Sequence, residues 1–299
     1  MKDINRRDFM KTAAATAVVG SFLPKAVLAD IAKSTIYVVH GMNIKKMVKL
    51  GIARMGGWKA FVKKGEKVTI KPNIAWPSRP EQGGNTDPVL VGECVAACKT
   101  AGASEVVVPE NPCGNPKQSF PMSGIEDAVK KAGGRIYVAK KREYFRKKDL
   151  PKAKNLKHAD VVIDVMDTGC LINMPVAKNH GSSVLTLSMK NWMGSVRDRG
   201  FWHGHNLHQC IADFSTFIKP SLIIIDATRI MLTRGPRGPG ELDHPNQLIF
   251  GRDPVAVDAY AATLFKKKPF DIPHIKIAHE MGIGCGDLSK VNVVHLKTE

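Results

Sequence analysis

A polar cluster near the middle of the sequence holds the residue types that bind anions and move protons. Lys178, His180, Lys190 and Asn191 fall within fourteen residues. Two ammonium groups, an imidazole and an amide can hold a carboxylate or phosphate and exchange protons with it. Thr186 and Lys190 are four residues apart, so we expect them on one face of a helix. An isolated Lys or His on an apolar face is usually structural, but this clustering predicts that Lys178, His180 and Lys190 are catalytic and that Asn191 binds the ligand.

Two apolar runs end in polar side chains suited to anions or metals. The run 68–70 is followed by Lys71 and, after a proline, by Asn73, and the run 222–225 is followed by Asp226. Ligands of open α/β sheets bind outside the carboxyl ends of the strands. We therefore predict that Lys71 and Asn73 bind an oxyanion and that Asp226 is a base or a metal ligand. The alternative for the first segment is a turn that only terminates the strand.

The segment after Asp226 adds two arginines and another carboxylate. A loop rich in glycine and proline carries Arg234 and Arg237, whose guanidinium groups suit an anionic ligand. Asp253 precedes a proline and is expected to cap a helix. Asp258 lies just over one turn into that helix, and we predict that it faces the same crevice and contributes to ligand binding.

A histidine-rich run has the composition of a metal site. His203, His205, His208 and Cys210 fall within eight residues. His205 and His208 are three apart at the expected start of a helix, and His203 precedes them in a loop that contains glycine. We predict that the three histidines bind a transition metal. The alternative is a helix cap with surface histidines, because the run lacks the His-Glu-x-x-His pattern.

Short β-branched runs alternate with helical patterns along the chain, as in an α/β fold. The expected strands are 36–40, 67–71, 105–109, 135–139, 161–165, 221–226 and 291–296. The expected helices are 43–55, 87–100, 124–131, 207–217, 254–265 and 272–281. Ser123 and Glu126 have the spacing of a capping box. We predict a largely parallel sheet with helices on both faces, in a single large or two-lobed domain.

The N-terminus has the features of an export signal. Arg6 and Arg7 precede Phe9, an Ala-rich apolar stretch follows, and Ala29 ends a small-residue cleavage site. We predict a twin-arginine signal peptide over residues 1–29, a folded domain over 30–299 and a periplasmic location. The alternatives are an uncleaved anchor or a chance basic start. Six cysteines at irregular spacing favour buried small side chains over a disulfide framework.

The composition is globular but strongly basic. The 299 residues are 43% hydrophobic and 24% charged, with a formal net charge of +18. These values exclude a disordered chain, a collagen-like repeat and a multi-pass membrane protein. Export and an aromatic content of 6% argue against a nucleic-acid partner. The segment 140–157 has nine basic and two acidic residues and is expected to be an exposed connection, either a solvated surface or a docking site for an acidic redox partner or an anionic membrane surface.

These segments, in this order, resemble the domain-of-unknown-function 362 family. The matching pieces are Lys71-Pro72-Asn73, Thr86-Asp87-Pro88, Ala101-Gly102-Ala103, Lys178-Asn179-His180, Lys190-Asn191 with Gly194, Ile211-Ala212-Asp213, Ile225-Asp226, Gly235-Pro236 and the segment from Asp253 to Asp258. The resemblance implies an α/β fold and a frequent association with iron–sulfur proteins. Some members carry an appended ferredoxin domain, which this sequence lacks. The histidine run is richer here than the family pattern requires.

Two functions of different classes follow from these residues. The first is an enzyme or enzyme-like cofactor protein with redox or lyase-type chemistry, in which His180 is the acid–base group and an anion is bound by lysines. Its cofactor would be a transition metal or an iron–sulfur cluster. The second is a non-catalytic accessory protein that binds an anionic ligand and serves a periplasmic redox system.

Overall fold

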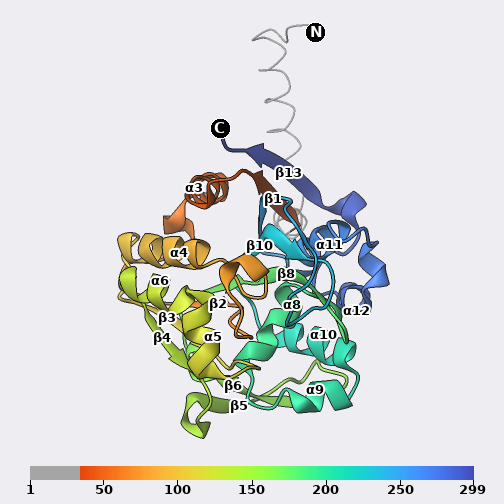
Figure 1. The fold of residues 1–299 in the computed structure, drawn as a ribbon. Helices are drawn as coiled ribbons and strands as arrows, with labels where there is room; N and C mark the ends of the chain where they lie inside the picture. The colour runs from red at the N-terminus through yellow and green to blue at the C-terminus, as the bar shows by residue number, and fades with distance from the viewer. Residues whose placement is uncertain (1–33) are drawn as a thin grey trace, which may run out of the picture.

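The computed structural model describes residues 34–299, which fold around a central sheet (Figure 1). Eight strands form its continuous path. In spatial order they are β13 (Asn292–Lys297), β1 (Thr35–His40), β12 (Gln247–Gly251), β10 (Leu222–Met231), β7 (Cys170–Met174), β2 (Lys67–Pro72), β3 (Glu105–Glu110) and β4 (Arg135–Val138). On this path only β12 is antiparallel to its two neighbours. The predicted largely parallel sheet is therefore confirmed.

Strand β10 is long because it pairs with two strands in turn. Its first half pairs with β7, and its second half pairs with β8 (Val176–His180). Pro175 lies between β7 and β8 and has no N–H group, so the ladder is interrupted there. Strand β8 also pairs with β9 (Val184–Thr186), and the short β11 (Leu242–Asp243) pairs with the end of β10. This extension carries polar side chains beyond the carboxyl end of the main sheet.

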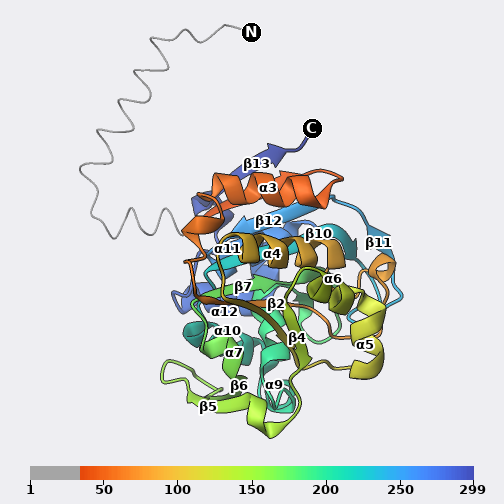
Figure 2. The same ribbon diagram turned by 90° about the vertical axis from the view of Figure 1, so that its left-hand side faces the viewer.

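Helices cover both faces of the sheet, as predicted (Figures 1 and 2). One face packs against α3 (Ile44–Arg54), α4 (Pro88–Thr100), α5 (Pro116–Ser123) and α6 (Ile125–Lys131). The other packs against α10 (Leu207–Phe217), α11 (Pro254–Thr263) and α12 (Pro273–Glu280). Along β10, Leu222 and Ile224 belong to the first core, whereas Ile223 and Ile225 belong to the second. This alternation follows from the two-residue period of a strand.

Several helix starts follow the predicted caps. The carboxylate of Asp87 accepts a hydrogen bond from Val89 N at the start of α4, and that of Asp253 accepts from Val255 N and Ala256 N at the start of α11. The predicted capping box at Ser123 is wrong. Helix α5 ends at Ser123, and α6 begins after Gly124, which has φ of 71° and no capping side chain.

Some strands depart from the sequence prediction. The expected strand 161–165 is instead the end of β6 (His158–Val162) followed by a short helix, α7 (Ile163–Met166). Strands β7 and β12 were not predicted, although both lie in the middle of the sheet. Each has five residues, all buried, and so shows none of the polar alternation that marks a half-buried strand.

The Lys and Arg residues of the basic segment 140–157 are exposed, as expected, and the segment forms the first strand and the loop of a hairpin. It contains β5 (Phe145–Asp149), which is antiparallel to β6. Phe145, Leu150 and Leu156 are buried beneath it, while its Lys and Arg side chains point to solvent. The buried Asp213 on α10 accepts hydrogen bonds from three backbone N–H groups of the hairpin loop, those of residues 154, 155 and 156, at 2.6–2.9 Å. This carboxylate therefore anchors the hairpin to the second helical layer.

We expect Asp213→Ala to lower the free energy of unfolding by about 3 kcal/mol, because each buried donor that loses its partner costs about 1–3 kcal/mol. Urea denaturation measures the change. Asp149→Ala removes an exposed carboxylate from the same hairpin and should change stability by less than about 0.5 kcal/mol. Equal denaturation midpoints for the two variants would contradict the anchoring role of Asp213.

Candidate functional site

A cavity of about 320 Å³ lies beyond the carboxyl ends of β2 and β3, against β8. Its wall also includes the short helices α8 (Ser188–Asn191) and α9 (Gly200–Gly204) and the loop after β10. The predicted residues that line it are Asn73, Lys178, His180, Lys190, Asn191, His203 and Arg237. The structure thus brings together side chains from four separate segments of the sequence.

Lys71 and Glu110 form a buried ion pair at the floor of this region. Lys71 Nζ lies 2.7 Å from Glu110 Oε2, and the two residues are 0% and 2% exposed. Burial lowers the pKa of Lys71, and the charge of Glu110 opposes this shift. Gly194 packs directly over the pair, since a Cβ atom there would lie 1.9 Å from Glu110 Oε1. Lys71 therefore pairs with Glu110 beneath the cavity and does not itself line it.

A chain of amide side chains holds the next lysine. Asn191 Nδ2 donates to Asn173 Oδ1 at 2.8 Å, and Asn73 Nδ2 donates to Asn191 Oδ1 at 3.1 Å. Asn73 Oδ1 then accepts a hydrogen bond from Lys178 Nζ at 3.1 Å, and the carbonyl of Gly84 accepts another. Lys178 thus has neutral partners only. Burial, reinforced by the charge of Lys190, lowers the pKa of Lys178 to about 7.

Lys190 is buried without a partner. It is 8% exposed and makes no hydrogen bond or ion pair with any residue in the described part of the chain. Burial lowers its pKa to about 8. The hydroxyl of Thr186, which also lines the cavity, is buried and has no hydrogen-bond partner among residues 34–299. The predicted shared helix face is wrong, because Thr186 ends β9 while Lys190 lies in α8, but the turn between them aims both residues at one space.

His180 is a neutral hydrogen-bonding group. Its Nδ1 accepts from the backbone N–H groups of Ser182 and Ser183 at 3.1 and 3.3 Å, so the neutral ring carries its proton on Nε2. Burial, together with the charges of Lys190 and Lys178, lowers the pKa of His180 to about 3. At neutral pH this ring is therefore uncharged, and its Nε2–H is available to donate a hydrogen bond.

The two predicted aspartates support the site from outside the cavity. Asp226 accepts hydrogen bonds from Asp87 N, Thr228 N and Thr228 Oγ1 at 2.7–3.1 Å, which occupy both of its oxygens. Asp258 accepts from the N–H groups of Ser188 and Met189 at the start of α8, and burial raises the pKa of Asp258 to about 7. Neither carboxylate lines the cavity. Asp226 holds the loop before α4, and Asp258 holds the helix that carries Lys190.

The three histidines that were predicted to form a metal centre contact different partners. His203 lines the cavity, whereas His205 stacks on Phe201 and its Nδ1 contacts Phe201 O at 3.0 Å. His208 Nδ1 lies 3.1 Å from Nδ1 of the buried His274 on α12. Asn206, with φ of 58°, turns the chain between α9 and α10 and so separates His208 from the two histidines that precede it. Within residues 34–299 no group of three or more His, Cys, Asp or Glu side chains is placed to hold a metal ion.

Only one of the two predicted arginines lines the cavity. Arg237 lines the cavity, and its guanidinium lies 4.6 Å from the ring centroid of Trp76, another lining residue. Arg234 precedes it by three residues in the same loop but does not line the cavity. Its backbone has φ of 54°, and its carbonyl accepts a hydrogen bond from Gly238 N at 3.0 Å, which closes the loop. Arg234 is therefore part of the turn that presents Arg237.

Sequence reasoning missed several lining residues, which are Trp76, Glu110, Cys113 and Arg199. Glu110 follows the expected strand 105–109 and could have been found by the reasoning that identified Lys71. Cys113 and Arg199 meet across 86 positions of sequence, with Arg199 Nη1 donating to Cys113 Sγ at 3.1 Å. No spacing in the sequence signals that contact.

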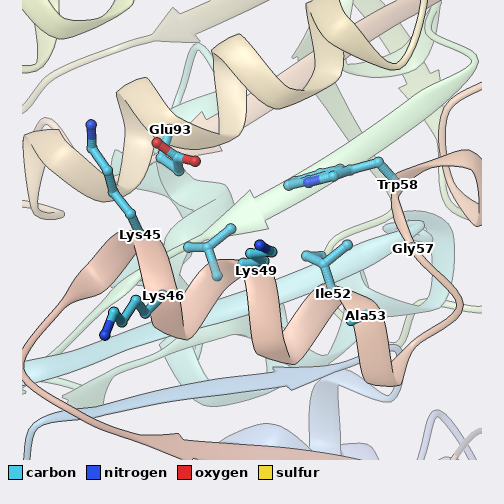
Figure 3. Close-up of a pocket in the computed structure, with 9 residues that line it drawn as sticks. Lys45, Lys46, Lys49, Ile52, Ala53, Gly57, Trp58 and Glu93 are labelled. Carbon is cyan, nitrogen blue, oxygen red and sulfur yellow. The ribbon is translucent and has the colours of Figure 1, made fainter. Parts of the chain in front are cut away.

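A second cavity shows what distinguishes the first. It has a volume of about 370 Å³ and lies between α3 and α4, where Lys45, Lys46 and Lys49 stand near Glu93 and Trp58 (Figure 3). These lysines are exposed and solvated, in contrast to Lys178 and Lys190. It contains none of the predicted site residues, all of which lie within residues 34–299.

The N-terminus matches the signal sequence of the twin-arginine translocation pathway over residues 3–22, which indicates export. This segment and the predicted cleavage after Ala29 lie outside the described residues. In residues 34–299 we find no helix with both the length and the apolar character needed to cross a membrane.

Three known proteins are similar to this chain at low sequence identity. The thylakoid-associated protein sll1697 of Synechocystis sp. is 22% identical over 237 residues, covering 77% of this chain and 72% of that protein. The lactate racemase apoprotein of Thermoanaerobacterium thermosaccharolyticum matches with a TM-score of 0.41 and 14% identity over 75% of this chain. A crystal structure from Thermotoga maritima matches with a TM-score of 0.39 and 9% identity, also over 75%. The chain spans 56% and 59% of the lengths of those two solved chains.

A family model covers the cavity itself. The domain of unknown function 362 (DUF362) matches residues 68–263, from β2 to the end of α11. This range includes every cavity-lining residue named above. Because the match extends over more than half of the sequence, the chain belongs to the DUF362 family.

Proposed function

We propose that this exported protein binds a small organic anion, a carboxylate or a phosphate ester, in the cavity lined by β8 and α8, and exchanges a proton with it. The observation that carries the proposal is Lys190, a lysine residue that is only 8% exposed and has no protein partner in the described part of the chain. A buried charge without a partner is costly, so its position favours an anionic ligand that completes its surroundings.

The charge balance of the cavity supports an anion. Its one lining carboxylate, Glu110, is paired with Lys71, and the lining cations Lys178, Lys190 and Arg199 form no ion pair within residues 34–299. Because Lys178 and Lys190 are buried, this surplus attracts a ligand more strongly than the same charges would on the surface. A volume of about 320 Å³ lies at the small end of the range for ligand sites, which favours a small metabolite.

The lysines, rather than His180, are the acid–base groups of this proposal. A group moves protons best when its pKa lies near the ambient pH, and burial lowers the pKa of Lys178 to about 7 and that of Lys190 to about 8. His180, with a pKa lowered to about 3, orients the ligand through Nε2–H. In this proposal the lysines accept a proton beside a bound carboxylate and return it. That role favours lyase-type chemistry over passive ligand binding by an accessory protein.

The other predicted partners and cofactors have less support. The described residues do not offer the donor set that a transition metal or iron–sulfur cluster requires, so the proposal involves neither. A periplasmic location fits the export signal. Docking of an acidic redox partner or an anionic membrane surface on the segment 140–157 stays a prediction.

Sulfate tests the cavity, because it carries two negative charges and no reactive carbon. We expect calorimetry at pH 6.5 to detect binding to the purified protein. Lys190→Met should weaken it about tenfold or more, since a hydrogen bond to a charged group contributes about 1.5–3 kcal/mol. Lys49→Met removes an exposed lysine from the second cavity and should leave the affinity unchanged. The proposal is wrong if sulfate does not bind, or if the two variants bind it equally well.

The affinity for sulfate should fall as the pH rises from 6 to 9. Sulfate keeps its charge over this range, whereas Lys178 and Lys190 lose their protons as the pH passes their pKa values of about 7 and about 8. Only the protonated lysines attract the anion, so binding takes up protons and weakens at high pH. Calorimetry in buffers of different ionisation enthalpy measures that uptake. A flat profile with no proton uptake would show that these lysines do not contact the anion.

A further inference from the structure

Cys113 stands on the wall of the anion cavity, and the proposed function gives it no role. All six cysteines lie in the described part of the chain and are free, and Cys113 alone is exposed. Arg199 faces it with both ends of its guanidinium, donating from Nη1 to Cys113 Sγ and from Nη2 to Pro112 O, each at 3.1 Å. The fork of Arg199 thus fixes the position of the sulfur beside the cavity.

The sulfur also has cationic neighbours. Cys113 shares the wall of the cavity with the buried Lys178 and Lys190, and Arg199 Nη1 lies 3.1 Å from its Sγ. Reactive cysteines are found in partly exposed, electropositive surroundings of this kind. Buried cysteines such as Cys94 and Cys98 differ, because burial raises the pKa of both thiols and closes them off from reagents.

A ligand space adjoins this sulfur. Lys190 and Thr186 line the same cavity as Cys113, and both are more than nine-tenths buried with no hydrogen-bond partner among residues 34–299. An anion held by these groups would fill the cavity next to Sγ. The Cys113 thiol therefore lies beside a space that is suited to one bound anion.

We propose that Cys113 is a nucleophile towards small anions that carry an electrophilic carbonyl carbon, such as 2-oxo acids. This inference rests on the proposed function, because the lysines hold the charged end of the ligand. In the reaction, a sulfur electron pair forms an S–C bond and the C=O π pair moves to the oxygen. The thiol proton passes to that oxygen through Lys190, so that the thiol has added across the carbonyl and nothing else is consumed. The reverse reaction releases the ligand.

Two alkylating reagents that differ in charge test the inference. With each, the S–C bond forms and iodide leaves with its electron pair, but iodoacetate is anionic and iodoacetamide is neutral. The ratio of their rates on one protein does not depend on the fraction of thiolate, because both react with the same thiol. We expect this ratio at Cys113 to exceed that of N-acetylcysteine in the same buffer about tenfold, since a cationic cleft concentrates anionic reagents.

Peptide mass spectrometry locates the label, and variants identify its cause. Cys113→Ser should abolish the fast iodoacetate reaction, and Cys285→Ser, which removes a half-buried cysteine outside this cavity, should leave it unchanged. Arg199→Gln and Lys190→Met should each lower the ratio several-fold. Addition of sulfate should slow the iodoacetate reaction.

The outcomes separate this inference from the function on which it rests. If sulfate binds as proposed but the rate ratio at Cys113 equals that of N-acetylcysteine, Cys113 is not a directed nucleophile and anion binding stands. If sulfate does not bind, the anion site itself is wrong, whatever the rate ratio. Fast iodoacetate labelling that persists in Cys113→Ser would also overturn the inference.

Discussion

Lys71 and Glu110 meet where β2 and β3 end, and the loop that carries Asn73 into the cavity depends on that ion pair. Glu110 Oε2 also accepts a hydrogen bond from Ile74 N at 2.9 Å, so the pair fixes the backbone just after Asn73. Asn73 in turn positions Lys178, and Gly194 brings the short 3₁₀ helix after α8 (Trp192–Ser195) against Glu110. Breaking a buried ion pair by removing one partner costs about 3–5 kcal/mol. The loop after β2 therefore depends on both charges being present.

The same ion pair decides the charge of the cavity. Because Glu110 is occupied by Lys71, Lys178 has only an amide and a backbone carbonyl as partners, and Lys190 has none in the described residues. Neutral partners do not compensate for the lost solvation of an ammonium group, which is why the pKa values of these two lysines fall towards neutrality. One structural ion pair thereby leaves two lysines poised to lose or gain a proton.

The part of the site that depends on local order could be predicted from the sequence. Lys71 and Asn73 were identified because parallel strands end at a shared edge, and Lys178, His180, Lys190 and Asn191 because they lie close together along the chain. Contacts between distant segments could not be predicted. Spacing placed three histidines together, but the backbone turn at Asn206 separates His208 from the other two, and His205 stacks on Phe201 while His203 lines the cavity. Similarly, the fully buried β7 and β12 lack the polar alternation by which a strand is recognised.

The strong basicity of the chain is a poor guide to its chemistry, because most Lys and Arg side chains of residues 34–299 are exposed to water. Lys45, Lys46 and Lys49 surround a cavity of similar size, yet they are exposed (Figure 3). The Lys and Arg side chains of the hairpin at 140–157 are solvated in the same way. An exposed ammonium group is stabilised by solvent whether or not an anion is present. Lys190 is only 8% exposed and therefore less hydrated than these lysines, so an anion that reaches it supplies more of the interactions that water provides elsewhere. Burial, and not the number of charges, singles out the lysines that can carry a function.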